Sequence, residues 1–461
     1  MFILFLAEPI IKLIDILPGM WIAFIFNPIA TFLSSNIKIP YIRPAYICIF
    51  DSLVSNSHPG GASKWYNSFS VTNTRYPFQK SWRWRLVQAF DFTFDWFGTF
   101  NSSKPFPQTV KNILVVRLDH IGDLICSLPV FPILKERFPN ATITVLTGAE
   151  GEAILKENPF VDQLIVFRSN WFLRKKILNA IEFFEVLSLL RKAKFDVGYD
   201  LRGDLRNIIF MFLTGVRFRI GYGIAGGAGL LHRVGEYDER LHQAELNVKL
   251  VSGEVPARIS LKPKIYLSAY EQKEAGEILN QSGIQKTDRI VAIHPEAGYV
   301  SKEWEEKNLK QLIELLLRDP SNKILIFGLS KAAKIAEAFF PPHPNPLPQG
   351  EGRVRGQVIN LVGKISLRQM ISVIARAHLF IGNDSGPSHI AQALGIPAIV
   401  IASGTNEYDR WGIWQQPSKV LSHAVSCAPC HLMECNVEGH PCMSQISGEQ
   451  VFEEAKRLLN V

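Results

Sequence analysis

Cysteine is scarce in this chain of 461 residues: six occur, and four of them crowd between residues 427 and 442. Secreted domains that depend on disulfides are usually short and carry cysteine at high density. The low count and the uneven spacing therefore exclude a disulfide scaffold and indicate a reducing compartment.

Signatures of nucleic-acid-binding modules are also missing. The chain contains no RNA-recognition, zinc-finger or helix-turn-helix pattern, so we expect no nucleic acid among its partners. Its net charge of +8 favours other anionic partners, such as nucleotides, phosphorylated glycolipids or an anionic membrane surface. A composition of 47% hydrophobic and 20% charged residues is that of a globular protein with about two or three domains.

Charged residues are absent from residues 16–37, and the run 21–26 is strongly apolar. About 20 apolar residues can span a bilayer, but prolines interrupt this stretch, so it predicts either a span or an interfacial anchor. A signal peptide is not expected, because Glu8 and Asp15 stand where a basic segment would be needed.

Basic and aromatic side chains then mix through residues 38–97, as is typical of a lipid headgroup region. A helical extension packed on the body is the alternative. We predict that residues 1–110 form a membrane-associating extension and that the following body is cytoplasmic, either peripheral to the membrane or anchored in it.

From residue 111 onward, short apolar strands alternate with helical stretches, which is the pattern of parallel βαβ units. Strands are expected at 113–117, 142–147, 163–167, 195–200, 290–294, 323–327, 358–361, 377–381 and 398–401. This pattern predicts an α/β fold with two Rossmann-like domains, at 111–255 and 256–461, and a ligand cleft at the carboxyl ends of their strands. The proline-rich stretch 341–356 is expected to be an insertion in a surface loop without a function.

The stretch Gly382–His389 has the residue pattern of a strand-to-helix turn that faces an anion. Its glycines allow a sharp turn and a close approach to the backbone, and the new helix offers free N–H groups and a positive dipole end. Asp384 or Ser385 could instead simply cap the helix.

A second acidic turn follows the first strand, at Leu118–Asp123. A carboxylate there could accept the proton of an attacking hydroxyl, and Asp119 and His120 are nearby alternatives as base. The structural alternative is that Asp123 caps a helix beginning near Leu124.

Three motifs occur in order: Arg117–Asp123, then His294–Gly298 with Lys302 and Trp304, then Gly382–Pro387 with His389. Together they resemble the successive motifs of glycosyltransferase family 9, the heptosyltransferases of lipopolysaccharide core assembly, over roughly residues 111–461. The resemblance implies a GT-B fold and an inverting transfer that requires no metal or other cofactor. It also implies a nucleotide-sugar donor, with ADP-heptose first among the candidates, and a lipopolysaccharide-core or lipid-linked acceptor at the inner-membrane surface of a bacterium.

The resemblance also assigns roles. Asp123 matches the proposed base, and Lys302 would neutralise charge on the leaving diphosphate. A solvated lysine beside neighbouring glutamates is the alternative for Lys302. The remaining candidates are His294, Asp384, Ser385, Gly386 and His389 for the donor, and Arg117, Asp119, His120 and Gly122 for the acceptor side.

One position departs from the family pattern, in which a glutamate often follows the glycine that ends the second strand of the donor domain. Here Gly328 is followed by Leu329-Ser330-Lys331, which leaves the nucleotide base open. Two alternatives stay open with it: a same-fold transferase for another sugar, and a non-catalytic membrane-anchored protein that binds nucleotide-sugars.

The four crowded cysteines are Cys427, Cys430, Cys435 and Cys442. Four thiolates can form a closed tetrahedral zinc site, with His431 and His440 as substitute ligands. Free, packed thiols are the favoured interpretation, and no catalytic metal is expected.

Overall fold

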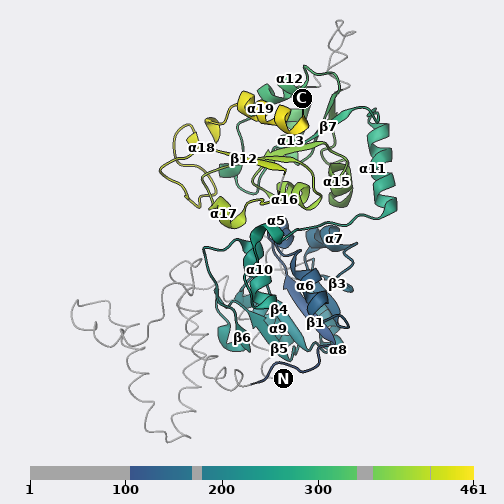
Figure 1. Cartoon of the computed structure of the whole chain (residues 1–461), viewed down its shortest axis with the longest axis vertical. Helices are drawn as coiled ribbons and strands as arrows, with labels where there is room; N and C mark the ends of the chain where they lie inside the picture. Colours follow the sequence, from purple (N-terminus) through teal and green to yellow (C-terminus); the bar gives the residue numbers. More distant parts are fainter. Residues whose placement is uncertain (1–103, 169–178, 340–356, 416, 461) are drawn as a thin grey trace, which may run out of the picture. The chain divides into compact units, whose positions relative to one another are not determined.

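The structure is a computed structural model that describes residues 104–168, 179–339, 357–415 and 417–460. Residues 1–103 of the predicted extension and the predicted insertion 341–356 lie outside the described residues. The rest of the chain forms two Rossmann-like domains, each built on a six-stranded parallel sheet (Figure 1). The predicted α/β fold of GT-B type is confirmed, whereas the exact domain boundaries stay predictions.

The sheet of the first domain has the strand order β3-β2-β1-β4-β5-β6. Its strands are β1 (Asn112–Arg117), β2 (Thr142–Thr147), β3 (Gln163–Val166), β4 (Val197–Asp200), β5 (Phe218–Gly221) and β6 (Arg233–Val234). Its helices are α5 (Ile121–Ile125), α6 (Val130–Arg137), α7 (Ala149–Leu155), α8 (Ala180–Ala193), α9 (Leu205–Leu213) and α10 (Gln243–Ser252).

The central strand β1 explains why helices cover both faces of this sheet. Successive side chains of a strand point to opposite faces, and all four residues from Ile113 to Val116 are fully buried. Ile113 and Val115 pack in a cluster with α5, α6 and α10. Leu114 and Val116 pack in another with α8 and α9. The unbroken apolar run thus places the carboxyl end of β1, and the loop after it, at the middle of the sheet edge.

The sheet of the second domain has the strand order β12-β11-β10-β7-β8-β9. Its strands are β7 (Arg289–His294), β8 (Asn322–Ile326), β9 (Val358–Asn360), β10 (Leu379–Asn383), β11 (Ala398–Ala402) and β12 (Ser418–Ser422). Its helices are α11 (Ala269–Gln281), α12 (Glu306–Leu316), α13 (Ser330–Ala338), α15 (Leu367–Ile374), α16 (Gly386–Ala393), α17 (Tyr408–Trp411), α18 (Pro441–Ser444) and α19 (Gly448–Leu459).

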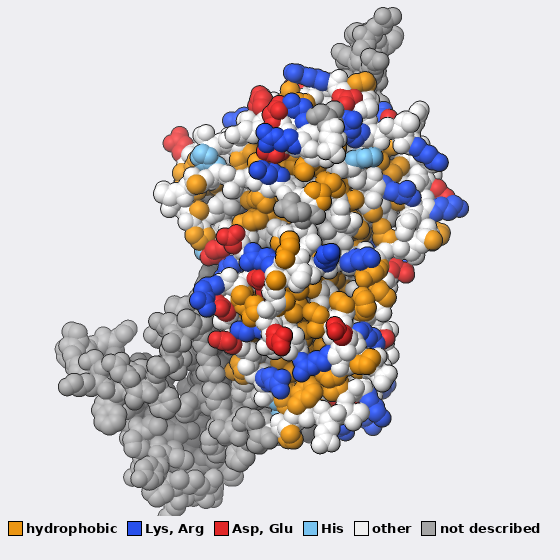
Figure 2. Space-filling model, in the orientation of Figure 1, with side chains coloured by type: hydrophobic (Ala, Val, Ile, Leu, Met, Phe, Trp, Pro, Cys, Tyr) orange, Lys and Arg blue, Asp and Glu red, His pale blue; other side chains and the backbone are white. Residues whose placement is uncertain are grey.

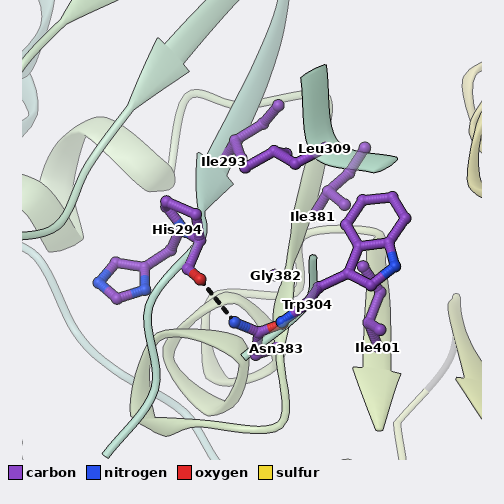
Figure 3. Close-up of a pocket in the computed structure, with 9 residues that line it drawn as sticks. Ile293, His294, Trp304, Leu309, Ile381, Gly382, Asn383 and Ile401 are labelled. Carbon is purple, nitrogen blue, oxygen red and sulfur yellow. Dashed lines mark hydrogen bonds between the residues drawn. The ribbon is translucent and has the colours of Figure 1, made fainter. Parts of the chain in front are cut away.

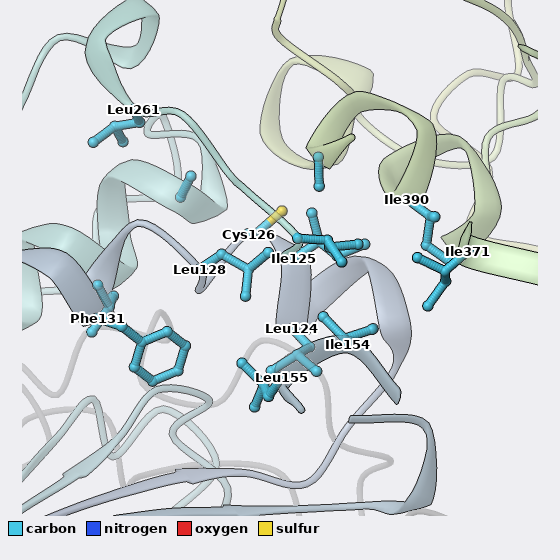
Figure 4. Close-up of a cluster of buried hydrophobic side chains, with 14 of the residues drawn as sticks. Leu124, Ile125, Cys126, Leu128, Phe131, Ile154, Leu155, Leu261, Ile371 and Ile390 are labelled. Carbon is cyan, nitrogen blue, oxygen red and sulfur yellow. The ribbon is translucent and has the colours of Figure 1, made fainter. Parts of the chain in front are cut away.

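A continuous apolar cluster joins the two domains. Leu124 and Ile125 of α5 belong to the same cluster of buried side chains as Ile371 of α15 and Ile390 of α16 (Figure 4). Beside it, Arg368 of α15 donates from Nη1 to the carbonyl oxygen of Ala153 at the end of α7, at 2.8 Å. Burial of apolar surface therefore fixes the carboxyl ends of β1 and β10 on facing sides of one junction.

Within the described ranges, the helices all fall short of the length and apolarity that a bilayer crossing requires.

Candidate active site

The turn after β1 and the turn after β10 touch across the domain junction. A Cβ atom built on Gly386 would lie 2.9 Å from the Cβ of Ile121, and one built on Gly122 would lie 3.1 Å from the His389 ring. Two first turns of helices, α5 and α16, can approach this closely only because each contributes a glycine. The structure therefore brings together two of the motifs that the sequence analysis had singled out separately.

Arg117 ends β1 inside the protein, with 2% of its surface exposed. Its Nε lies 3.0 Å from Asp119 Oδ1, and its Nη1 donates to the carbonyl oxygen of Leu201 at 2.7 Å. Its Nη2 donates to the carbonyl oxygen of Asp123 at 2.9 Å. Arg117, predicted on the acceptor side, thus joins the loop that carries Asp123 to the residue that follows β4.

Asp119 is held between two arginines. Arg202 Nη1 reaches Asp119 Oδ2 at 2.7 Å, opposite the contact from Arg117, and the Asp119 side chain is 1% exposed. The neighbouring Asp200 accepts from the N–H of Gly203 at 2.8 Å, and burial raises its pKa to about 7. Asp119 therefore neutralises buried cations and shapes the loop, while the adjacent His120 is exposed.

Asp123 lies in the first turn of α5, and His120 occupies the N-cap position. The alternative that Asp123 caps this helix is therefore wrong. Burial and the Asp119 charge raise the pKa of Asp123, against the opposing effects of Arg117, Arg202 and His120. Its side chain keeps 17% exposure, and Oδ1 lies 3.6 Å from Arg117 Nη2. A partly open carboxylate with a raised pKa has the properties of a general base.

Lys302 and Asp384 form an ion pair on the other side of the junction. Lys302 Nζ lies 2.7 Å from Asp384 Oδ2, and the two side chains are 13% and 12% exposed. With its amide turned so that the oxygen faces Lys302, Asn406 accepts from Nζ at 2.8 Å. The nearby glutamates bind other lysines, as in the 2.6 Å pair between Glu303 and Lys331. The alternative of a solvated Lys302 is therefore wrong.

Helix α16 begins after Ser385 without any cap from a side chain, so the simple capping interpretation of Asp384 or Ser385 fails as well. The turn is braced by Asn383, which donates to the carbonyl oxygen of Pro295 at 2.7 Å and accepts from the N–H of Trp304 at 3.1 Å (Figure 3). Gly382 permits this contact, because a Cβ there would lie 2.9 Å from the carbonyl oxygen of His294.

The pocket in Figure 3 lies beneath this turn and is mostly apolar, with Ile293, Ile381 and Ile401 among its lining residues. It is core packing rather than a ligand site. His294 points away from Trp304 in this view, its Nδ1 lies 3.1 Å from the carbonyl oxygen of Glu296, and burial lowers its pKa.

His389 is 5% exposed, and its Nδ1 has no hydrogen-bond partner among the described residues. Burial lowers its pKa to about 4, so the ring is neutral at physiological pH. It packs against Gly122 at the contact of α16 with α5. A candidate donor ligand by sequence, His389 thus also forms part of the domain junction.

Sequence reasoning missed Glu296. Its carboxylate accepts from the N–H groups of Lys331 at 2.9 Å and Ala332 at 3.1 Å, and also from that of Leu329. These groups form the N-terminus of α13, directly after Gly328, where the sequence lacks the family's usual acid. The only signal in the sequence was an acid two residues beyond the end of β7. Its contact with the start of α13 depends on how the two loops lie side by side in the fold.

The cysteine-rich segment supports the Lys302 loop through its backbone. The N–H of Ser301 donates to the carbonyl oxygen of Met433 at 3.1 Å, and that of Cys430 to the carbonyl oxygen of Gly404 at 3.0 Å. Cys427, Cys430, Cys435 and Cys442 are free thiols. In the part of the chain that the structure describes, no three His, Cys, Asp or Glu side chains are placed to hold a metal ion.

Comparison with known proteins gives consistent matches. The Campylobacter jejuni lipooligosaccharide heptosyltransferase 2 is 24% identical over 344 residues, which cover 73% of this chain and 96% of that protein. The solved structure of the Escherichia coli ADP-heptose lps heptosyltransferase II is 22% identical, with a TM-score of 0.61, and the match covers 76% of this chain and 98% of that one.

The Escherichia coli heptosyltransferase WaaC, solved with ADP-2-deoxy-2-fluoro heptose, shares the fold at a TM-score of 0.55 and 17% identity, over 75% of this chain and 99% of that one. The sequence model of glycosyltransferase family 9 (heptosyltransferase) matches residues 184–440, more than half of the chain. The chain belongs to glycosyltransferase family 9 and is a glycosyltransferase.

Proposed function

We propose that the protein is an inverting transferase that moves heptose from ADP-heptose to a lipopolysaccharide-core or lipid-linked acceptor. The observation that carries the proposal is the meeting of the Asp123 turn with the Lys302–Asp384 pair across the domain junction. The two turns are in contact, since a Cβ built on Gly386 would lie 2.9 Å from the Cβ of Ile121. A base and a diphosphate site on facing sides are what a direct displacement requires.

In the proposed step, an acceptor hydroxyl attacks the anomeric carbon of the donor while Asp123 accepts the hydroxyl proton. The bond from that carbon to the diphosphate oxygen breaks, and the diphosphate leaves with its electron pair. Lys302 stabilises the negative charge that develops there. The new bond forms on the face opposite the leaving group, so the configuration inverts.

The donor diphosphate is proposed at the start of α16, near Ser385 and Gly386. Several helices begin at this edge of the second sheet, and the start of α13 is already occupied by the Glu296 carboxylate. A second anion there would be repelled, whereas the α16 start has no side-chain cap and lies beside Lys302. Asp384 is proposed to bind sugar hydroxyls while its lysine partner turns toward phosphate.

The proposed adenine base rests on relatives, one of which, the Escherichia coli WaaC, was solved both with ADP and with an ADP-sugar. Because the acid that is usual in the family is missing after Gly328, other nucleotides remain candidates for the donor. The proposed location, at the cytoplasmic face of the inner membrane, rests on the lipopolysaccharide relatives and on the net charge of +8.

The test uses the full chain. We expect ADP to stabilise it against thermal unfolding by about 2.7 kcal/mol at 100 times the dissociation constant, and UDP, GDP and CMP to do so far less. Incubation with ADP-heptose and a heptose-free lipopolysaccharide core should then give a heptosylated product by mass spectrometry. Stabilisation by another nucleotide would change the donor, and binding without transfer to any acceptor would favour the non-catalytic alternative.

A further inference from the structure

Arg410 is a cation at the domain junction that the proposed mechanism does not use. It belongs to the short helix α17 of the second domain, and its Nη2 donates to the hydroxyl of Tyr237 in the first domain at 3.1 Å. Among the described residues its buried Nε has no hydrogen-bond partner, and the guanidinium carbon lies 6.0 Å from the ring centroids of Tyr237 and Trp411. Among the described residues, this partly buried cation is compensated by a neutral phenol and two aromatic rings rather than by a carboxylate.

Both partners are held rigidly. The Tyr237 ring packs edge-on against Tyr222, with centroids 5.2 Å apart. On the other side, the N–H of Ile413 donates to the Tyr408 hydroxyl at 3.0 Å, and His242 Nε2 contacts the carbonyl oxygen of Gly412 at 2.9 Å. The guanidinium is therefore presented at a fixed point between the domains, which favours a ligand of defined geometry.

This point lies beside the proposed reacting groups. Trp414, three residues beyond α17, donates its N–H to Gln392 Oε1 of α16 at 2.6 Å, and Asn247 of α10 donates to the carbonyl oxygen of Cys126, just after α5, at 3.1 Å. The donor diphosphate already has Lys302 and the start of α16. Arg410, a further cation that faces a tyrosine of the first domain, is therefore positioned to bind the acceptor.

We propose that Arg410 and Tyr237 form a subsite that binds a phosphate group of the acceptor saccharide. Guanidinium N–H groups form paired, charge-assisted hydrogen bonds with phosphate oxygens, and the tyrosine hydroxyl can donate one more. Because residues of both domains contribute, the subsite is complete only when the domains are together. The inference rests on the proposed transfer to a glycolipid acceptor.

The kinetic test compares a phosphorylated lipopolysaccharide core with the same core after chemical dephosphorylation. For the wild-type chain, removal of the phosphate should raise the acceptor KM by about 10-fold, the loss typical of one charge-assisted contact. Arg410→Gln should raise the KM for the phosphorylated core by a similar factor, leave that for the dephosphorylated core unchanged, and leave the KM for ADP-heptose unchanged. Arg410→Lys should recover part of the loss, and Tyr237→Phe should lose less.

The control is Arg240→Gln, since Arg240 lies three residues from Tyr237, is exposed and pairs with Asp238 at 2.9 Å. It should leave every KM unchanged. Equal losses on both cores, or a loss confined to the donor KM, would overturn the subsite while the transferase proposal stands.

A binding measurement keeps the two proposals separate. With ADP saturating the donor site, inorganic phosphate should raise the midpoint of thermal unfolding of wild-type and Arg240→Gln protein but not of Arg410→Gln protein. If that holds while neither core is glycosylated, the transferase proposal fails and the anion subsite stands. If phosphate stabilises Arg410→Gln as well as wild type, the subsite is wrong.

Discussion

The two turns that meet at the domain junction have the same topology but handle charge differently. After β1, Arg117 and Asp119 are paired with side chains that are each 1% exposed. After β10, Lys302 and Asp384 are paired with side chains 13% and 12% exposed. The first pair has no route to a ligand, whereas the second can open toward one.

The difference suggests that the two sides of the site have different roles. Breaking a fully buried ion pair leaves an uncompensated charge and is costly, so the Arg117 network holds the Asp123 loop in one geometry before any substrate arrives. The Lys302–Asp384 pair keeps 13% and 12% exposure, and an arriving diphosphate can replace Asp384 as the partner of Lys302. One side of the site is thus fixed in advance, and the other responds to the donor.

The largest expected effect is on stability, at the fixed side. Arg117→Met should lower the free energy of unfolding by about 3–5 kcal/mol, because Asp119 would lose its buried partner and keep Arg202, whose side chain is 34% exposed. Arg457→Met, which removes an exposed partner of Glu454, should cost less than about 1 kcal/mol. Chemical denaturation of both variants measures the loss of unfolding free energy. Equal small losses would contradict the difference proposed between the buried pair and the exposed pair.

At the responsive side the effect should be on turnover instead. Lys302→Met should lower kcat about 100- to 1000-fold, through loss of charge stabilisation on the leaving diphosphate, and should cost less unfolding free energy than Arg117→Met because Asp384 keeps 12% exposure. Lys307→Met is the matched control, because Lys307 pairs with Glu305 on the surface. Similar kcat values for the two variants would remove Lys302 from the proposed site.

The junction should also respond to pH through His242. This ring accepts from the N–H of Ala244 through Nδ1 and contacts the Gly412 carbonyl through Nε2, so it is neutral, and burial lowers its pKa to about 4. The unfolded value is about 6.5, so the stability is full above that pH and falls as the pH drops toward 4. Each such histidine contributes up to about 1.4 kcal/mol per pH unit in this window.

Between pH 7 and pH 5, the wild type should therefore lose up to about 2 kcal/mol more unfolding free energy than His242→Gln. Asp200, with a pKa raised to about 7, has the opposite slope in both proteins, so only their difference is diagnostic. The exposed His423 provides the control variant His423→Gln, which should follow the wild type. Parallel pH curves for all three proteins would refute the assignment.

The smallest expected effect comes from one methyl group at the contact of the two turns. Alanine normally stabilises a helix by up to about 1 kcal/mol relative to glycine, and Gly276→Ala in α11 meets nothing within 4 Å, so it should gain that amount. Gly386→Ala should lose rather than gain stability, because its Cβ would press on Ile121. Equal gains in thermal unfolding would show that the turns do not pack this closely.

Much of the fold follows from local sequence. Most of the buried strands of both sheets are short apolar runs, and these were predicted. The missed strands are β5, β6 and β12. Strand β5 is buried although the charged Arg219 interrupts its short run, whereas β6 and β12 are short or partly exposed. The motifs on the two turns were also visible, since glycine and acid after a strand indicate a special turn.

What the sequence could not give is which side chains meet. The pairing of Lys302 with Asp384, the burial of Asp119 between two arginines, and the reach of Glu296 to α13 all join loops far apart in the chain. Each depends on strand order and on the close approach of the helices, which local patterns do not encode. The predicted zinc alternative failed to gain support for the same reason, because spacing alone does not orient thiols.

The most direct test of the central claim is the turnover of Asp123→Asn with ADP-heptose and a lipopolysaccharide core. Asparagine keeps the size of the side chain but cannot take a proton, so kcat should fall at least about 100-fold. The dissociation constant for ADP and the unfolding midpoint should stay near the wild-type values, since the donor site lies across the junction. Unchanged kcat in a folded, ADP-binding variant would contradict the assignment of Asp123 as the base.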